Sequence, residues 1–234
     1  MNFKYLKISL TEDFPALRLI ITSLVIAFAV TVTVYKHIDL SDSVSASFSA
    51  PEAIILTLTD MINRVFIFLP LYIFVISGTK NVGLGNTGTV LQRSRPGLVA
   101  LEIIKVLFYT LIFFGILLII VLATSNAAFP QAEDFTRTFF GASSSFGIRS
   151  DVLQGTPQTA VTNLFTSMFL TYFTIGIINM FLSLLLKEEA AFVLTVIIGI
   201  LSEIFITAYR IPLSLAACAV FTALSFILIS RKNL

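Results

Sequence analysis

Three ionisable residues lie inside long apolar stretches, where a charge would be costly if those stretches cross a membrane. Asp60 and Arg64 are four residues apart, a spacing that permits an ion pair on one helix face. Glu203 lies in a later apolar run, and at 1.5 Å per residue it reaches the height of Arg64, roughly 20 Å inside one membrane face. Intramembrane charges normally face a partner or a wet cavity. We therefore expect Arg64 to bridge Asp60 and Glu203, as a fixed tie between helices or as part of a translocation path.

The motifs that would indicate an enzyme fail in their context. The segment from Gly83 to Gly88 matches G-x-G-x-x-G, but a dinucleotide site needs a preceding strand and a βαβ unit around it. We interpret these glycines as a bent, close-packed turn. No G-x-x-x-x-G-K-[ST] phosphate loop occurs in the sequence. The chain is therefore not expected to hydrolyse ATP by that route.

The remaining chemistry-bearing residues are also too few for catalysis. Glu188 and Glu189 resemble the paired glutamates of intramembrane proteases, but the arginine and histidines that such a site needs are missing, and a solvated turn is favoured. His37 is the single histidine and Cys218 the single cysteine, which argues against a metal site and excludes an intrachain disulfide. We predict no enzyme, no catalytic residue, no metal and no cofactor on this chain.

The composition is that of an integral membrane protein. Hydrophobic residues make up 57% and charged residues 12% of the 234 residues, whereas soluble domains have roughly 45–50% apolar and about 25% charged residues. The mean hydropathy is +0.98. A formal charge of +2 without a basic block gives no indication of nucleic-acid binding.

The apolar runs predict one all-α transmembrane domain over residues 1–234, with six spans. Phe3, Leu6, Leu10 and Phe14 recur at helical spacing, which predicts an amphipathic interfacial helix before the first span. Between spans the sequence predicts a cytoplasmic loop at 78–97 and a phenylalanine-rich outer loop at 125–159. The spans are expected at about 17–35, 53–77, 98–124, 161–186, 190–208 and 213–230.

The basic residues set the expected orientation. With the N-terminus inside, ten Lys and Arg residues lie on the cytoplasmic side and four on the outer side. Six spans then place both termini in the cytoplasm. We expect a multi-pass protein of the plasma membrane.

The segment Thr87–Lys105 resembles the type-2 ABC transporter permease family, in its small six-span bacterial form associated with antimicrobial-peptide export or immunity. It has a Gly-Thr, a short apolar helix, Ser-Arg, and a lysine that opens the third span. The acid that the family often places before the Gly-Thr is replaced by Asn86 and Thr87. The resemblance implies a coupling helix docked in an ATPase subunit, with contacts from Gly88, Thr89, Leu91, Arg93, Ser94, Arg95 and Lys105.

The same resemblance implies the partners. They are a cytoplasmic ABC ATPase that holds ATP and Mg²⁺, a second permease subunit, identical or related, and the lipid bilayer. The expected activity is export of amphipathic or hydrophobic substrates such as peptides or antibiotics. Two alternatives remain open: a secondary transporter driven by an ion gradient through Asp60, Arg64 and Glu203, and a non-transporting membrane scaffold or receptor.

Overall fold

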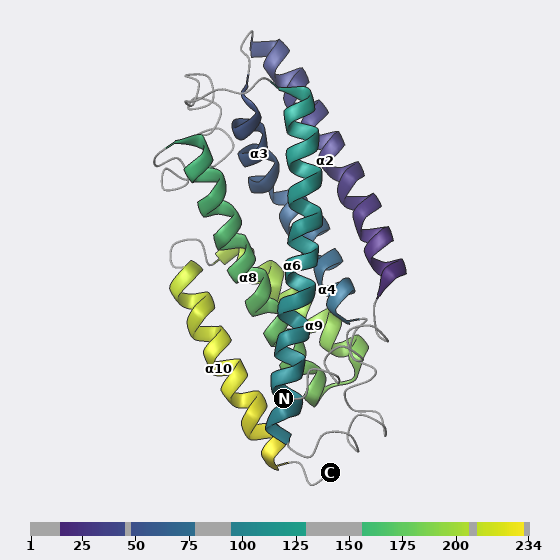
Figure 1. The fold of residues 1–234 in the computed structure, drawn as a ribbon, viewed down its shortest axis with the longest axis vertical. Coiled ribbons are helices and arrows are strands. Elements are labelled where there is room, and N and C mark those ends of the chain that lie inside the picture. The colour runs from purple at the N-terminus through teal and green to yellow at the C-terminus, as the bar shows by residue number, and fades with distance from the viewer. Residues whose placement is uncertain (1–14, 45–47, 78–94, 130–155, 206–209, 232–234) are drawn as a thin grey trace. The chain divides into compact units, whose positions relative to one another are not determined.

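The structure, a computed structural model, describes residues 15–44, 48–77, 95–129, 156–205 and 210–231, and these residues form helices without a strand (Figure 1). The predicted amphipathic helix at 1–14, the loop segment 78–94 and most of the outer loop lie outside the described residues. In chain order the elements are α2 (Ala16–Val44), α3 (Ala50–Thr59), the π-helix η1 (Ile62–Phe68), α4 (Leu69–Ser77), α6 (Arg95–Ala128), α8 (Pro157–Leu185), α9 (Glu188–Phe205) and α10 (Arg210–Arg231).

Four described helices are long and apolar enough to cross a membrane, at Ala16–Asp39, Val99–Ala128, Pro157–Leu185 and Pro212–Ile229. A fifth crossing is possible if Ala50–Thr59 and Ile62–Ser77, which are bent by 59° to one another, form one broken span. The all-helical class and a membrane-type set of helices are thus confirmed. The expected fifth span at 190–208 is not among these candidates, because the 18 residues of α9 contain three glutamates.

The described chain falls into two compact units. The first, called here the α9 unit, holds the described residues of Met1–Thr22, Leu69–Phe113 and Phe169–Leu234. The second, called the η1 unit, holds those of Ser23–Phe68 and Phe114–Met168. The single transmembrane domain expected from the sequence stays a prediction.

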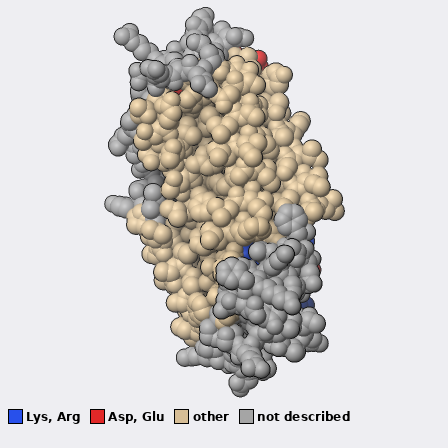
Figure 2. Space-filling view, viewed as in Figure 1, with Lys and Arg blue, Asp and Glu red and all other residues tan. Residues whose placement is uncertain are grey.

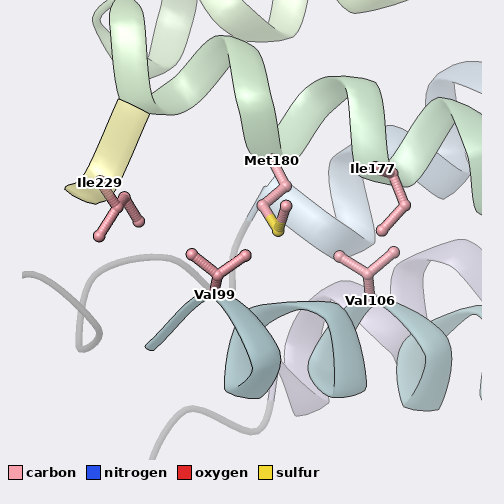
Figure 3. Packing of buried hydrophobic residues seen from close by; sticks show 5 residues of the cluster. All are labelled: Val99, Val106, Ile177, Met180 and Ile229. Carbon is pink, nitrogen blue, oxygen red and sulfur yellow. The ribbon is translucent and has the colours of Figure 1, made fainter. Parts of the chain in front are cut away.

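One core cluster of the α9 unit is apolar and draws its buried side chains from three helices. Figure 3 shows its buried side chains from α6, α8 and α10 meeting around Met180. Partly buried aromatic side chains, among them Phe173 and Phe221, pack against this cluster. The five buried members are Val99, Val106, Ile177, Met180 and Ile229.

Buried hydrogen bonds tie the helices of the α9 unit together. The Tyr72 hydroxyl of α4 lies 2.8 Å from Thr110 Oγ1 of α6. Asn179 of α8 donates its amide to Ser77 Oγ of α4 at 3.3 Å and accepts from Thr195 Oγ1 of α9 at 3.2 Å. In a membrane such side-chain bonds between helices supply specificity that apolar contact alone does not.

The outside of the described helices is mostly apolar. Figure 2 shows a face on which uncharged residues cover nearly all of the described surface. Phe28 of α2 and Ile119 of α6 expose 73% and 69% of their side-chain surface. Apolar side chains exposed in this number fit a surface that contacts lipid.

Gly176 of α8 provides a test of this packing. A Cβ at position 176 would overlap the Tyr72 hydroxyl and lie 2.6 Å from Val106 Cγ1. We expect Gly176→Ala to lower the free energy of unfolding in mixed micelles by roughly 1–3 kcal/mol, because α4 and α6 must both move away from α8.

Gly115→Ala is the matched control, since a Cβ there has no atom within 4 Å. The better helix propensity of alanine should leave that variant as stable as the wild type or slightly more stable. Equal losses in the two variants would contradict the close approach of α4, α6 and α8.

Candidate functional site at a broken helix

The η1 unit contains a break between two helices that the sequence predicts as one span. Asp60, with φ −56° and ψ 120°, leaves the helical conformation directly after α3. The chain then re-enters a helix as the π-helix η1, a form that is rare and frequent at functional sites. The segment predicted as a span at 53–77 is therefore bent at Asp60.

Local sequence explains where α3 begins and ends. Ser49 caps its start, with Pro51 in the first turn and the Glu52 carboxylate accepting from the Ser49 backbone N–H and hydroxyl. At the other end, Thr59 Oγ1 donates to the Ile55 carbonyl at 2.7 Å. A back-bonding threonine of this kind bends helices.

Asp60 then starts the next helix. Its Oδ1 accepts from the Asn63 backbone N–H at 2.9 Å, as a helix N-cap does. The Asp60 carbonyl accepts from the Arg64 N–H at 3.0 Å. Pro70 is the second residue of α4, two positions after η1 ends at Phe68.

Asn63 joins three elements at the break. Its Nδ2 donates to Thr33 Oγ1 of α2 at 2.9 Å and lies 3.5 Å from the Thr57 carbonyl in the last turns of α3. The Asn63 side chain is 3% exposed. One amide therefore holds α2, α3 and η1 at fixed positions in the η1 unit.

His37 belongs to the same site, which sequence reasoning missed. It is one turn beyond Thr33 on α2 and is 4% exposed, and the charges of Lys36 and Asp60 both act on it. His37 Nδ1 is buried and has no hydrogen-bond partner within the described part of the chain. The sequence did carry a signal, since Thr33 and His37 are spaced to share a helix face.

The predicted charge cluster is only partly assembled within one unit. Asp60 and Arg64 lie on either side of the start of η1, in the η1 unit. Glu203 is buried on α9, in the α9 unit. The bridge from Arg64 to Asp60 and Glu203 stays a prediction.

The predicted coupling residues are mostly beyond what the structure describes. Gly88, Thr89, Leu91, Arg93 and Ser94 fall in the segment 78–94. Arg95 is the first residue of α6. Lys105, further along α6, is 1% exposed, and its Nζ lies 3.3 Å from Glu102 Oε1. Lys105 is therefore buried in the α9 unit, where it pairs with Glu102 of the same helix.

A cavity in the α9 unit was not predicted. It has a volume of about 150 Å³ and lies among α8, α9 and α10. Its polar wall atoms are committed elsewhere: Thr174 Oγ1 donates to the Ser214 carbonyl at 3.1 Å, and Ser202 Oγ donates to the Gly199 carbonyl at 2.8 Å. The cavity therefore offers an apolar guest space and little hydrogen bonding.

The broken helix and the adjoining part of α2 bring together several kinds of polar and ionisable side chain. It combines a carboxylate, an imidazole, an amide and hydroxyl groups, which suit binding of a cation or movement of a proton. Among the described residues, no three His, Cys, Asp or Glu side chains gather as metal ligands. Comparison with family models, curated proteins and solved structures gave no match.

Asn63→Leu tests whether the Asn63 amide holds the break. The change keeps the side-chain size and removes the bonds to Thr33 and Thr57. We expect the free energy of unfolding in mixed micelles to fall by about 1–2 kcal/mol. Asn163→Leu, at an exposed position of α8, is the control and should change it little. A neutral Asn63→Leu variant would show that the break does not depend on this amide.

Proposed function

We propose that this chain is the membrane-spanning permease subunit of an ATP-driven transporter, with ATP and Mg²⁺ held by a separate cytoplasmic ATPase. The observation that carries the proposal is the anchoring of segment 78–94 at both ends in one compact unit. α4 ends at Ser77 and α6 begins at Arg95, and both ends belong to the α9 unit. A partner that bound this segment would act on two helices at once.

The contacts between these helices are suited to passing on such a load. The Tyr72 hydroxyl bonds Thr110, and the Tyr72 ring lies 5.4 Å from the Phe113 ring in an edge-on arrangement. Tyr72 also contacts Tyr172 of α8, with ring centroids 5.3 Å apart. Because packed side chains resist compression, movement of α4 would displace α6 and α8 as rigid bodies.

The finer features of the proposal come from the sequence. The chain would lie in the plasma membrane with six spans and with both termini in the cytoplasm. A docking helix would lie within 88–95. A second permease subunit would complete the pore, because one chain offers too few helices to enclose one. The substrates would be amphipathic or hydrophobic compounds such as peptides or antibiotics.

A second candidate is transport driven by an ion gradient, which the broken helix favours. In secondary transporters, discontinuous helices bind substrate or coupling ion at the break. The bend of 59° lies between Ala50–Thr59 and Ile62–Ser77, next to Asp60. The scaffold alternative rested on the outer loop, most of which lies outside the described residues.

The proposal is tested by purifying the tagged chain in mild detergent from cells that express its natural partners. We expect a soluble protein with a phosphate-binding loop to copurify in near-stoichiometric amount, together with ATPase activity. Arg95→Glu should lower the retained ATPase by about tenfold or more, because one partner of a charged contact is reversed.

Arg210→Glu is the matched control, since Arg210 is the same residue type at the predicted outer end of α10. That variant should retain the ATPase as the wild type does. Absence of any ATPase from the wild-type preparation, or equal retention in the Arg95→Glu variant, would contradict the proposed coupling.

A further inference from the structure

The cavity of the α9 unit lies beside two contacts that hold α8 and α10 together. At the first, Thr174 Oγ1 donates to the Ser214 carbonyl at 3.1 Å. Seven residues further along both helices, the rings of Phe181 and Phe221 meet with their centroids 5.3 Å apart. The two helices therefore run alongside each other in the same direction and are joined at two levels (Figure 1).

A small side chain between these levels accounts for the empty space. Ala217 of α10 and Ile178 of α8 lie between the two contacts, and both line the cavity. Ile198 of α9 lines it as well and packs against the buried cluster that contains Ile178. Because the two contacts fix the separation of α8 and α10, these helices do not close over the single methyl group at position 217.

The cavity does not suit water or an ion. A buried water needs two to four polar partners, and no described lining residue has a buried side-chain oxygen or nitrogen that lacks a partner. Thr174 Oγ1, for example, also lies 2.8 Å from the Leu170 carbonyl of its own helix. The described lining contains no charged residue. Apolar cavities of about this volume stay dry and bind small apolar molecules.

The cavity is continuous with the apolar outer surface of the unit. Leu213 lines it and is 44% exposed, so the cavity reaches the surface at the first turn of α10. On α9, Leu194 is 38% exposed and lies one turn before Ile198 on the same helix face. An apolar guest therefore has an apolar route to the cavity.

The cavity also lies at a depth where hydrocarbon is expected. The charged residues at 187–189, where α8 passes into α9, are all exposed and mark an end of the unit that meets water. Thr174 and Ser202 line the cavity, and each is 13 residues from this end, which is roughly 20 Å at 1.5 Å per residue. The hydrocarbon core of a bilayer is about 30 Å thick. Acyl chains therefore surround the helices at this level.

We propose that this cavity binds part of an acyl chain of a membrane phospholipid, which enters beside Leu213. The driving force is dispersion, because the chain leaves one apolar environment for another and gains contacts with side chains that would otherwise face a void. Neither a water-soluble polar ligand nor a metal ion would find partners in this lining.

The bound chain would help to hold α10 in place. Within the span Pro212–Ile229 of this helix only 11% of the residues are buried, the lowest share among the four long candidate spans. An acyl chain in the cavity contacts α8, α9 and α10 at once and adds to the two contacts at Ser214 and Phe221. This inference does not depend on the ATP-driven proposal, since it needs only a bilayer around the helices.

Photolabelling from within the bilayer provides the test. The full chain is reconstituted in vesicles of phosphatidylethanolamine and phosphatidylglycerol that contain a minor fraction of phosphatidylcholine with a diazirine at the middle of one acyl chain. After irradiation, the labelled residues are mapped by mass spectrometry. We expect label on Ile175 and Ile178, which are only 2% and 7% exposed and line the cavity. Ile119, which is 69% exposed, reports contact with bulk lipid.

Variants that fill the cavity establish the route of labelling. Ala217→Leu and Ser202→Leu fill it from different helices, and each should lower the label on Ile175 and Ile178 by roughly tenfold relative to Ile119. Because filling a cavity commonly stabilises a protein, neither change should lower the midpoint of thermal unfolding. Ala223→Leu, the same change at an exposed position of α10 outside the cavity lining, should leave the labelling as it is in the wild type.

Three results would overturn the proposal. The first is a wild-type chain labelled at Ile119 but not at Ile175 and Ile178, which would show that a second copy or another part of this chain covers the cavity. The second is unchanged labelling in both filling variants, and the third is an equal loss in Ala223→Leu. Two filling variants on separate helices keep the test decisive if one of them does not fold. Loss of ATPase copurification would not alter the labelling, so the two proposals fail separately.

Discussion

Backbone polar groups that lie in a lipid-filled environment must be satisfied from within the protein, and this constraint governs the described helices. A continuous helix meets it without help. The break between α3 and η1 does not, and side chains supply the missing partners. Asp60 Oδ1 accepts a hydrogen bond from the Asn63 N–H, and the Thr59 hydroxyl donates to the Ile55 carbonyl of α3. The Asn63 side-chain amide donates to Thr33 Oγ1 and to the Thr57 carbonyl.

The α9 unit meets the same constraint differently. Its helices keep their backbone bonds and are tied through side chains, with Asn179 between Ser77 and Thr195, and Tyr72 bonded to Thr110. Gly176 lets α8 approach Tyr72 and Val106 closely. The result is a tightly specified unit around the ends of α4 and α6. The η1 unit, by contrast, places polar side chains at a bend, and two of their buried atoms, Thr57 Oγ1 and His37 Nδ1, have no hydrogen-bond partner among the described residues.

Sequence patterns predicted the helices better than the site. Long apolar runs located α2, α6, α8 and α10 to within a few residues at most ends, because a membrane helix needs about 20 apolar residues. The span expected at 190–208 stays a prediction, since the structure describes it only as far as Phe205 and α9 begins at Glu188.

The site was only half visible in the sequence. Asp60 and Arg64 stood out as charges in an apolar run. The exact place of the break did not, because the chain leaves the helix at Asp60 inside an otherwise apolar run. His37 was set aside as a lone histidine near the end of the first span. Its place near the break emerges only when tertiary contacts bring Thr33 of α2 to Asn63 of η1, which a pattern along one chain does not encode.

The most direct test is the backbone conformation of residues 54–68 in a lipid bilayer, measured by ¹³C chemical shifts in solid-state NMR. The account predicts helical Cα shifts for Ile54–Leu58 and for Asn63–Phe68, interrupted by a non-helical shift at Asp60, whose ψ is 120°. Uninterrupted helical shifts from Ile54 to Phe68 would show that the span is continuous, and the broken-helix site would then not exist.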